Sequence, residues 1–362
     1  MPSQRTLHSD YMEWAKLCSQ ARFNLATSGL VDYPLAELPV RLEELELTGP
    51  SFYGYQPLQQ LLAAKCAVPE GSVVAAIGTS MANHLAMAAV LNPGDQVLIE
   101  RPTYEPLLAA ARYLGAEIRR FDRHFSSDFR VDPQEIARHL SPKTRLIVIT
   151  NLHNPSGALT DEKTMKQVGE MARSAGAKVL VDEVYLETLY AKAPRSAFHL
   201  GEQFLVTGSL TKAYGLGGLR CGWILAEPEL ARRLWRLNDL FGVIPAHVAE
   251  RLSVIALQNL DRMAARSRAI LEANRTVFDG FLESCETLEL FRPEYGTIIF
   301  PRLRQGDANR FCALLREKYE TAVVPGSFFE MPNHFRLGLG GPTEMVAAGL
   351  ARLADALRDF SS

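Results

Sequence analysis

The chain of 362 residues has few cysteines, and no pairing pattern connects them. Their number is odd, they are widely separated, and they include neither a CxxC pair nor a histidine at the spacing of a metal site. We therefore expect reduced thiols, no bound metal and a cytoplasmic protein. The five cysteines are Cys18, Cys66, Cys221, Cys285 and Cys312.

Long apolar runs are also missing. No stretch approaches the roughly 18–20 apolar residues that cross a bilayer, and residues 1–10 lack the apolar segment of a signal peptide. Neither charge dominates, because 39 Lys and Arg against 41 Asp and Glu leave a formal net charge of −2. We therefore expect no membrane partner and no nucleic-acid partner.

Between residues 73 and 223, short apolar runs alternate with segments of helical length. The runs cover 73–77, 96–100, 145–150 and 178–182. Continuous apolar strands separated by helices are typical of βαβ units, so the sequence predicts an α/β fold with a mainly parallel sheet covered by helices on both faces. Helix starts are expected at Asp132 and at Thr160, the second helix ending before Gly176.

The pattern changes after about residue 241. Residues 246–282 keep one apolar face at helical spacing and predict a single connector helix. Two short apolar runs and two further helices follow and predict a smaller α+β lobe, onto which residues 1–45 fold back. We therefore predict a large domain of residues 46–245 and a small domain built from 1–45 and 246–362, at both chain ends.

A carboxylate stands at the end of an apolar strand in Val181-Asp182-Glu183-Val184-Tyr185. Burying it costs several kcal/mol unless it meets a partner, so Asp182 is either a helix cap, half of an internal ion pair, or the partner of a protonated ring nitrogen. The carboxyl end of a parallel strand is where open α/β sheets bind ligands.

A lysine lies in the small-residue segment 208–215, which we expect to be a loop, and Arg220 follows it. Lys212 is either a surface residue or a nucleophile whose pKa is lowered by burial and nearby positive charge. The glycines at 215–218 lack the GxGxxG spacing of a dinucleotide loop, and we discount that interpretation.

Two further polar segments follow predicted strands. Asn154 lies in the turn after 145–150, and Thr79 and Ser80 precede a helix predicted at 81–91. The free N–H groups at a helix start can hold a phosphate, although Thr79 or Ser80 as a simple N-cap explains the pattern equally well.

Taken together and in order, these segments resemble the class I/II aminotransferases related to aspartate aminotransferase, which are pyridoxal-phosphate enzymes of fold type I. The resemblance covers essentially the whole chain. It rests on Asn154-Pro155-Ser156-Gly157, on Asp182-Glu183-Val184-Tyr185, on Ser209-x-x-Lys212 and on Gly218-Leu219-Arg220-x-Gly222-Trp223.

The resemblance implies a pyridoxal 5′-phosphate cofactor and assigns residues to it. Lys212 matches the lysine that forms the internal aldimine and then moves the proton between Cα and C4′. Asp182 matches the carboxylate that keeps the pyridine nitrogen protonated, and Asn154 and Tyr185 match the donors to the phenolic oxygen. The remaining matches are the phosphate ligands Thr79, Ser80, Ser209 and Arg220, and Tyr104, which stacks on the ring.

The resemblance also implies a substrate site and a homodimer with shared active sites. Arg336 matches the arginine that holds the substrate α-carboxylate with a bidentate fork, beside Asn154. Tyr53, or alternatively Tyr55, matches the tyrosine that reaches the phosphate of the neighbouring subunit. Residues 24–29 match the N-terminal segment that covers the substrate.

The activity that the resemblance implies is transfer of an amino group between an amino acid and a 2-oxo acid in ping-pong half-reactions. The same cofactor supports a lyase, decarboxylase, cyclase or racemase, because the motifs do not decide which Cα bond breaks. A non-catalytic regulator is disfavoured, since residues 1–20 are too few for a winged helix.

No second arginine is assigned to a substrate side chain, since Arg266, Arg268 and Arg275 lie on the connector, and His84 and His153 receive no role.

Overall fold

The computed structural model describes residues 6–283 and 285–361. Its centre is a seven-stranded sheet in the order β2-β8-β7-β6-β5-β3-β4, in which only β8 runs antiparallel to its neighbours. The α/β fold with a mainly parallel sheet is therefore confirmed. The strands are β2 (Val73–Ile77), β3 (Gln96–Arg101), β4 (Glu117–Asp122), β5 (Thr144–Thr150), β6 (Lys178–Asp182), β7 (Phe204–Ser209) and β8 (Cys221–Leu225).

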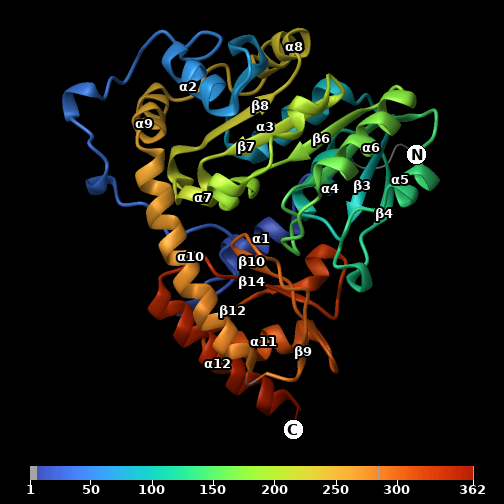
Figure 1. The fold of residues 1–362 in the computed structure, drawn as a ribbon, viewed down its shortest axis with the longest axis vertical. Coiled ribbons are helices and arrows are strands. Elements are labelled where there is room, and N and C mark those ends of the chain that lie inside the picture. The colour runs from blue at the N-terminus through green and yellow to red at the C-terminus, as the bar shows by residue number, and fades with distance from the viewer. Residues whose placement is uncertain (1–5, 284, 362) are drawn as a thin grey trace.

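Helices cover both faces of this sheet (Figure 1). Successive residues of β5 alternate between two cores: Leu146 and Val148 pack on one side, Ile147 and Ile149 on the other. The first core is closed by α3 (Gly78–Val90), α4 (Glu105–Tyr113) and α8 (Pro228–Asn238), and the second by α2 (Gln56–Cys66), α5 (Pro133–His139) and α6 (Glu162–Ser174).

Four of the seven strands match the predicted apolar runs. The other three, β4, β7 and β8, were not predicted from the sequence. β4 is an edge strand in which only Phe121 is buried, so its charged residues face water. β7 contains Gly208 next to its last residue, and a Cβ there would lie 2.8 Å from the Trp223 indole of β8. The glycine that makes β7 look like a loop therefore makes room for its neighbour.

The helix starts agree with the sequence to within a few residues. Asp132 caps α5 by accepting the Gln134 N–H. For α6 the prediction of Thr160 was wrong by one residue, because Asp161 is the cap and accepts the Thr164 N–H. α6 ends before Gly176 as expected, and α3 begins at residue 78 rather than 81.

The predicted single connector is two helices, α9 (His247–Gln258) and α10 (Leu260–Glu283). The break lies at Asn259, whose backbone leaves the helical region and whose side chain donates to the Ile255 carbonyl. A short polar side chain that competes for backbone hydrogen bonds explains the interruption. In Figure 1, α10 runs from the sheet down into the lower lobe.

The lower lobe combines both chain ends. β1 (Phe23–Asn24) pairs in parallel with β12 (Thr321–Ala322), and Leu25 lies in the same core as α11 (Ala308–Tyr319) and α12 (Thr343–Ser361). The domain limits at 46 and 245 remain a prediction. The lobe also contains α1 (Asp10–Leu17), β9 (Leu288–Glu289), β10 (Ile298–Ile299), β11 (Arg302–Leu303), β13 (Val324–Pro325) and β14 (Phe335–Gly338). None of the helices described is long and apolar enough to cross a membrane.

Candidate active site

A cavity of about 220 Å³ lies where β5, β6 and β7 end, with Thr150, Asp182 and Ser209 in its wall. This is the sheet edge at which open α/β folds bind ligands. Nine of the ten residues predicted to hold the cofactor line this cavity, and Tyr53 does not. The nine are Thr79, Ser80, Tyr104, Asn154, Asp182, Tyr185, Ser209, Lys212 and Arg220.

Lys212 lies on a short helix, α7 (Thr211–Tyr214), that follows β7 directly, so the expected loop was wrong. Its Nζ donates a 2.9 Å hydrogen bond to Ser28 Oγ. Burial and the charge of Arg336 lower the pKa of Lys212 to about 8, although Asp182 acts in the opposite direction. A fraction of this amine is therefore neutral and nucleophilic near neutral pH.

Asp182 is held by neutral donors rather than by a cation. Asn83 Nδ2 donates to Oδ2 at 2.8 Å and the Val184 N–H donates to Oδ1 at 3.1 Å. The Thr207 hydroxyl donates to Asn83 Oδ1 at 2.6 Å, which fixes the amide orientation. Burial raises the pKa of Asp182 to about 6. The carboxylate is oriented, and a ligand can still supply a positive partner.

An anion-binding corner forms where α3 begins. Gly78 has φ +73°, and a Cβ on it would lie 2.3 Å from Arg220 Nη2, so only glycine lets the guanidinium approach this helix start. Thr79 Oγ1 is buried here without a hydrogen-bond partner among the described residues. A guanidinium, an unpaired hydroxyl and the free N–H groups of a helix N-terminus fit a phosphate.

Arg336 lies on β14, behind the cavity wall, and is 1% exposed. Its Nη1 donates to Asn154 Oδ1 at 2.9 Å and its Nη2 to the Tyr11 hydroxyl at 2.8 Å, whereas its Nε is buried without a partner among the described residues. Because Asn154 Oδ1 accepts from Arg336, Asn154 Nδ2 remains a donor.

Tyr104 and Tyr185 are both buried. The Tyr104 ring meets the Tyr11 ring edge to face, with 5.5 Å between centroids, and its hydroxyl contacts Met12 Sδ at 3.5 Å. Burial raises the pKa of Tyr104, and raises that of Tyr185 to about 12. Both hydroxyls therefore remain protonated and can donate at neutral pH.

The two tyrosines considered for a neighbouring subunit differ in exposure. Tyr53 is 54% exposed and donates to Asp239 Oδ2 at 3.2 Å. Tyr55 is buried, accepts a 2.7 Å hydrogen bond from Arg251 and packs edge to face on His247. Of the two, only Tyr53 has its side chain at the surface.

Residues that the sequence did not single out complete the wall: Tyr11 and Met12 on α1, and Asn83 on α3. Asn83 carried a usable signal, because it is an amide among the apolar residues of α3. Ser28 lies in the segment 24–29 that was matched to a substrate cover. Tyr11 had no local signal, since its role depends on Arg336, 325 residues away.

The two histidines occupy structural positions. His153 is buried, with its Nε2 2.9 Å from the Pro102 carbonyl and its Nδ1 2.6 Å from Ser156 Oγ. Burial lowers its pKa well below the usual value, so it stays neutral. His84 packs its ring edge to face on Phe241.

The chain is similar to known proteins along most of its length. Residues 42–353 match the family model of aminotransferase class I and II, and the chain belongs to this family. It is 29% identical over 352 residues to the capreomycidine synthase of Streptomyces vinaceus, covering 93% of this chain and 90% of that protein. It is 23% identical over 360 residues to the aspartate aminotransferase of Streptomyces avermitilis, covering 92% and 88%.

Solved structures share the fold along nearly the whole chain. A pyridoxal-phosphate-dependent aminotransferase of Streptococcus suis superposes with a TM-score of 0.93 at 24% identity, covering 99% of this chain and 100% of that one. The pyridoxal-phosphate-dependent cyclase OrfR superposes with a TM-score of 0.89 at 25% identity, covering 99% and 98%. The chain is a pyridoxal-phosphate-dependent enzyme, and its anion corner and oriented Asp182 fit that cofactor.

Proposed function

We propose that this protein is an aminotransferase that moves an amino group between an amino acid and a 2-oxo acid in ping-pong half-reactions. The observation that carries the proposal is the convergence of an amine of lowered pKa (Lys212), an oriented carboxylate (Asp182) and an anion corner (Arg220) on one cavity. Each half-reaction uses the same cavity, so donor and acceptor bind in turn.

Pyridoxal phosphate, when bound, supplies an electron sink for the carbanion left at the substrate Cα. Around it, Asp182 would hold a proton on the ring nitrogen, and Asn154 Nδ2 and Tyr185 would donate to the phenolic oxygen. Tyr104 would stack on the ring. The phosphate would be held by Thr79, Ser80, Ser209 and Arg220.

Lys212 would act as nucleophile toward the cofactor and then as general base toward the substrate. A primary amine with a pKa near 8 can take a proton from the substrate Cα and return it at neutral pH. Ser28 holds Nζ by the 2.9 Å hydrogen bond and so limits the directions in which the amine can move. Burial keeps bulk water from competing for the proton.

Arg336 would bind the substrate α-carboxylate. Its guanidinium is buried and its Nε has no partner within residues 6–283 and 285–361, so a donor is available to an incoming anion. Asn154 and Tyr11 orient the guanidinium, and Asn154 would contact the substrate as well.

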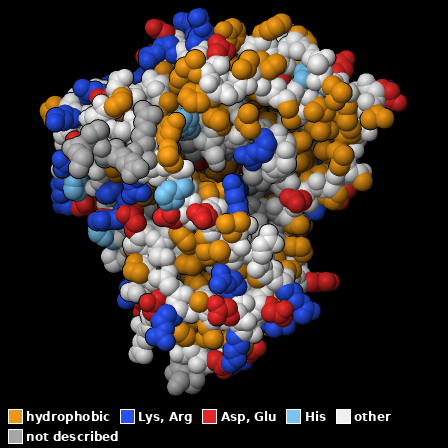
Figure 2. Space-filling model, turned by 180° about the vertical axis from the view of Figure 1, so that it is seen from behind, with side chains coloured by type: hydrophobic (Ala, Val, Ile, Leu, Met, Phe, Trp, Pro, Cys, Tyr) orange, Lys and Arg blue, Asp and Glu red, His pale blue; other side chains and the backbone are white. Residues whose placement is uncertain are grey.

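We further propose a homodimer with shared sites, in which Tyr53 reaches the neighbouring phosphate. Its support is a set of exposed apolar side chains on the segment 35–53 and the segment 240–244, and exposed apolar surface is where protein partners bind. In Figure 2 apolar side chains are spread over the upper right of the molecule. The set comprises Leu35, Leu42, Leu47, Phe52, Leu240, Phe241, Val243 and Ile244. A cytoplasmic location rests on five cysteines that are all free in the structure.

A cyclase is the second candidate. It is favoured by the similarity to capreomycidine synthase and to the cyclase OrfR. A cyclase and an aminotransferase both begin by removing the Cα proton, and the residues around Lys212 serve either outcome. The lyase and decarboxylase alternatives draw no comparable support.

The deciding experiment incubates the purified holoenzyme with single amino acids and a 2-oxo acid acceptor and identifies the products by mass spectrometry. Transfer of ¹⁵N from donor to acceptor supports the aminotransferase. A product that retains its nitrogen and closes a ring supports the cyclase and overturns the proposal. Lys212→Ala should abolish either reaction, since the nucleophile and the base are lost together.

A further inference from the structure

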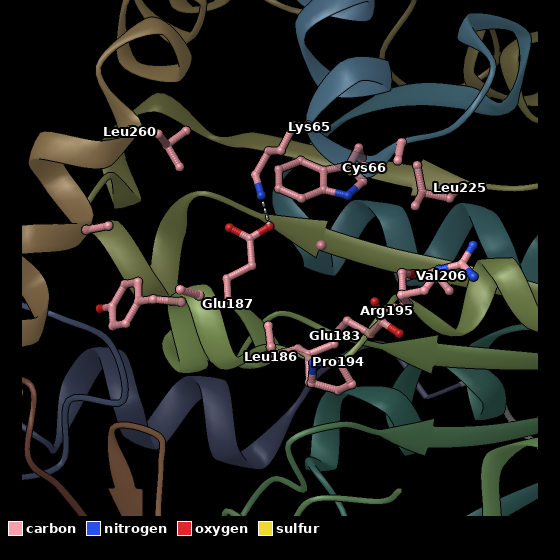
Figure 3. Close-up of a pocket in the computed structure, with 18 of the residues that line it drawn as sticks. Lys65, Cys66, Glu183, Leu186, Glu187, Pro194, Arg195, Val206, Leu225 and Leu260 are labelled. Carbon is pink, nitrogen blue, oxygen red and sulfur yellow. Dashed lines mark ion pairs between the residues drawn. The ribbon is translucent and has the colours of Figure 1, made fainter. Parts of the chain in front are cut away.

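A second cavity, of about 580 Å³, lies on the α2 side of the sheet and shares no lining residue with the active-site cavity. Its walls come from α2, from the 3₁₀ segment η5 (Leu186–Lys192), from β7 and β8, and from the start of α10. Figure 3 shows Lys65 and Glu187 pointing toward one another across it. The mechanism proposed above uses none of these side chains.

The centre of this cavity offers a donor and an acceptor side by side. Lys65 Nζ and Glu187 Oε1 are 2.6 Å apart, and their side chains are 22% and 19% exposed, so both are reachable from the cavity. Burial is the largest single effect on the pKa of Lys65 and lowers it, but the charge of Glu187, its hydrogen bond and the neighbouring Cys66 and Cys221 together raise that pKa above its usual value. The lysine is therefore a fixed cation.

Both partners have bonding capacity left over. Glu187 Oε2 is buried without a hydrogen-bond partner of good geometry among the described residues, and the Tyr214 hydroxyl, which also lines the cavity, lies near this carboxylate. Lys65 has three N–H donors and, within the described part of the chain, Glu187 is its only ion-pair partner. An unpaired buried acceptor costs about 1–3 kcal/mol unless a ligand or water satisfies it.

The rest of the lining limits the kind of ligand. Trp223, Val206 and Leu225 form an apolar wall beside the ion pair, with the Trp223 ring centroid 5.8 Å from Lys65 Nζ. Burial raises the pKa of Glu183 to about 7, and the charged lining side chains are three basic and three acidic, so no large net charge favours a cation or an anion. These charged side chains are Lys65, Arg195, Arg268, Glu183, Glu187 and Asp261.

We propose that this cavity is a second ligand site, which binds a free amino acid with an apolar side chain as its zwitterion. The ligand carboxylate accepts from Lys65, the ligand ammonium donates to Glu187 Oε2, and the side chain packs on the wall of Trp223, Val206 and Leu225. A zwitterion satisfies both unused groups without changing the balance of charge. This site is independent of the proposed function.

The test uses a probe that cannot react with the cofactor. N,N-dimethylphenylalanine has a tertiary amine, so it forms no covalent bond with pyridoxal phosphate, yet it keeps a carboxylate, one N–H donor and an apolar side chain. Calorimetric titration of the holoenzyme should show saturable binding. 3-Phenylpropanoate, which lacks the ammonium, and N,N-dimethylphenethylamine, which lacks the carboxylate, should each bind at least tenfold more weakly.

Variants locate the site. Glu187→Gln should weaken binding of the probe at least tenfold. Ala264→Leu, which fills the cavity from α10 and leaves the ion pair intact, should do the same and covers the case in which Glu187→Gln does not fold. Arg336→Lys, which alters the active-site anchor, should leave this binding unchanged.

Three results would overturn the proposal: no saturable binding, equal binding of an analogue that lacks one charge, or binding lost in Arg336→Lys and kept in Ala264→Leu. The last result places the probe in the active-site cavity. None of these results bears on amino transfer, which the ¹⁵N experiment tests separately.

Discussion

Arg336 donates a 2.9 Å hydrogen bond to Asn154 Oδ1 and thereby connects β14 of the lower lobe to the turn after β5 in the sheet. The bond fixes which end of the Asn154 amide faces the cavity, because the oxygen is occupied and the NH₂ group is left to donate. In the proposed function, one buried arginine would thus both anchor the substrate carboxylate and orient a cofactor donor.

Arg336→Lys should separate these two effects. Lysine keeps the positive charge but loses the fork, and losing a charge-assisted hydrogen bond costs about 1.5–3 kcal/mol. We expect KM for the amino donor to rise roughly ten- to a hundredfold, with a smaller change in kcat. Steady-state kinetics check this, and an unchanged KM would contradict the role of Arg336 as anchor.

The pH dependence of cofactor capture should report on Lys212. The neutral amine is the reactive form, so capture should be slow below the lowered pKa and rise as the pH passes about 8. An unperturbed lysine would require a pH near 10.5. The measurement is the rate at which cofactor-free protein binds pyridoxal phosphate covalently, trapped with borohydride at each pH and identified by mass spectrometry.

Two variants test in which direction this pH profile moves when a neighbouring group is changed. Arg336→Met removes a positive charge that lowers the pKa of Lys212, so its profile should move to higher pH. Ser28→Ala removes a hydrogen-bond partner of Nζ without changing the charge and is the matched control. A profile that stays in place in Arg336→Met would contradict the electrostatic explanation.

The strands that the sequence predicted have a continuous buried apolar run at their centre, as residues 146–149 of β5 do. The sequence did not predict β4, because this edge strand carries charged residues. It did not predict β7, because that strand contains Gly208, which leaves room for the Trp223 indole. These two exceptions depend on a neighbouring strand or on solvent, neither of which a local pattern contains. The third strand that was not predicted, β8, is short and buried throughout.

The residues of the candidate site also fall into those that a local motif reveals and those that depend on distant partners. Asp182, Lys212 and Asn154 stand in short ordered motifs and could be proposed from the sequence. Asn83 was visible only as an amide among apolar residues, because its partner Asp182 lies 99 residues away, and Tyr11 had no local signal, because Arg336 lies 325 residues away. The second cavity had no sequence signal at all, since Lys65 and Glu187 meet only after α2 packs on the sheet.

Gly78→Ala should weaken cofactor binding by a steric route. The added Cβ would lie 2.3 Å from Arg220 Nη2 and displace the guanidinium from the anion corner. Gly94→Ala is the matched control: its φ is +89°, close to the +73° of Gly78, but nothing lies within 4 Å of the added carbon. Both variants should lose about 1 kcal/mol of stability from backbone strain.

Only Gly78→Ala should raise the dissociation constant of pyridoxal phosphate, by roughly tenfold or more if one charge-assisted hydrogen bond is lost. Thermal unfolding measures the loss of stability that the two variants share. Titration of each cofactor-free variant with pyridoxal phosphate measures the difference in their cofactor affinity. Equal cofactor affinity in the two variants would show that Arg220 does not hold the phosphate.

Mixing two impaired chains tests whether the sites are shared. If Tyr53 completes the neighbour's site, Tyr53→Phe and Lys212→Ala damage different parts of each site in a dimer. In a mixed dimer, one site has both defects, whereas the other combines an intact Lys212 with an intact Tyr53. Random reassociation of equal amounts makes half of the dimers mixed, so activity should recover to about a quarter of the wild-type value above the residual activity of Tyr53→Phe.

Tyr55→Phe in place of Tyr53→Phe gives the matched control, since Tyr55 is buried against Arg251 in its own subunit. That variant should lose stability without showing recovery on mixing, and the absence of recovery with Tyr53→Phe would mean that each subunit builds its site alone.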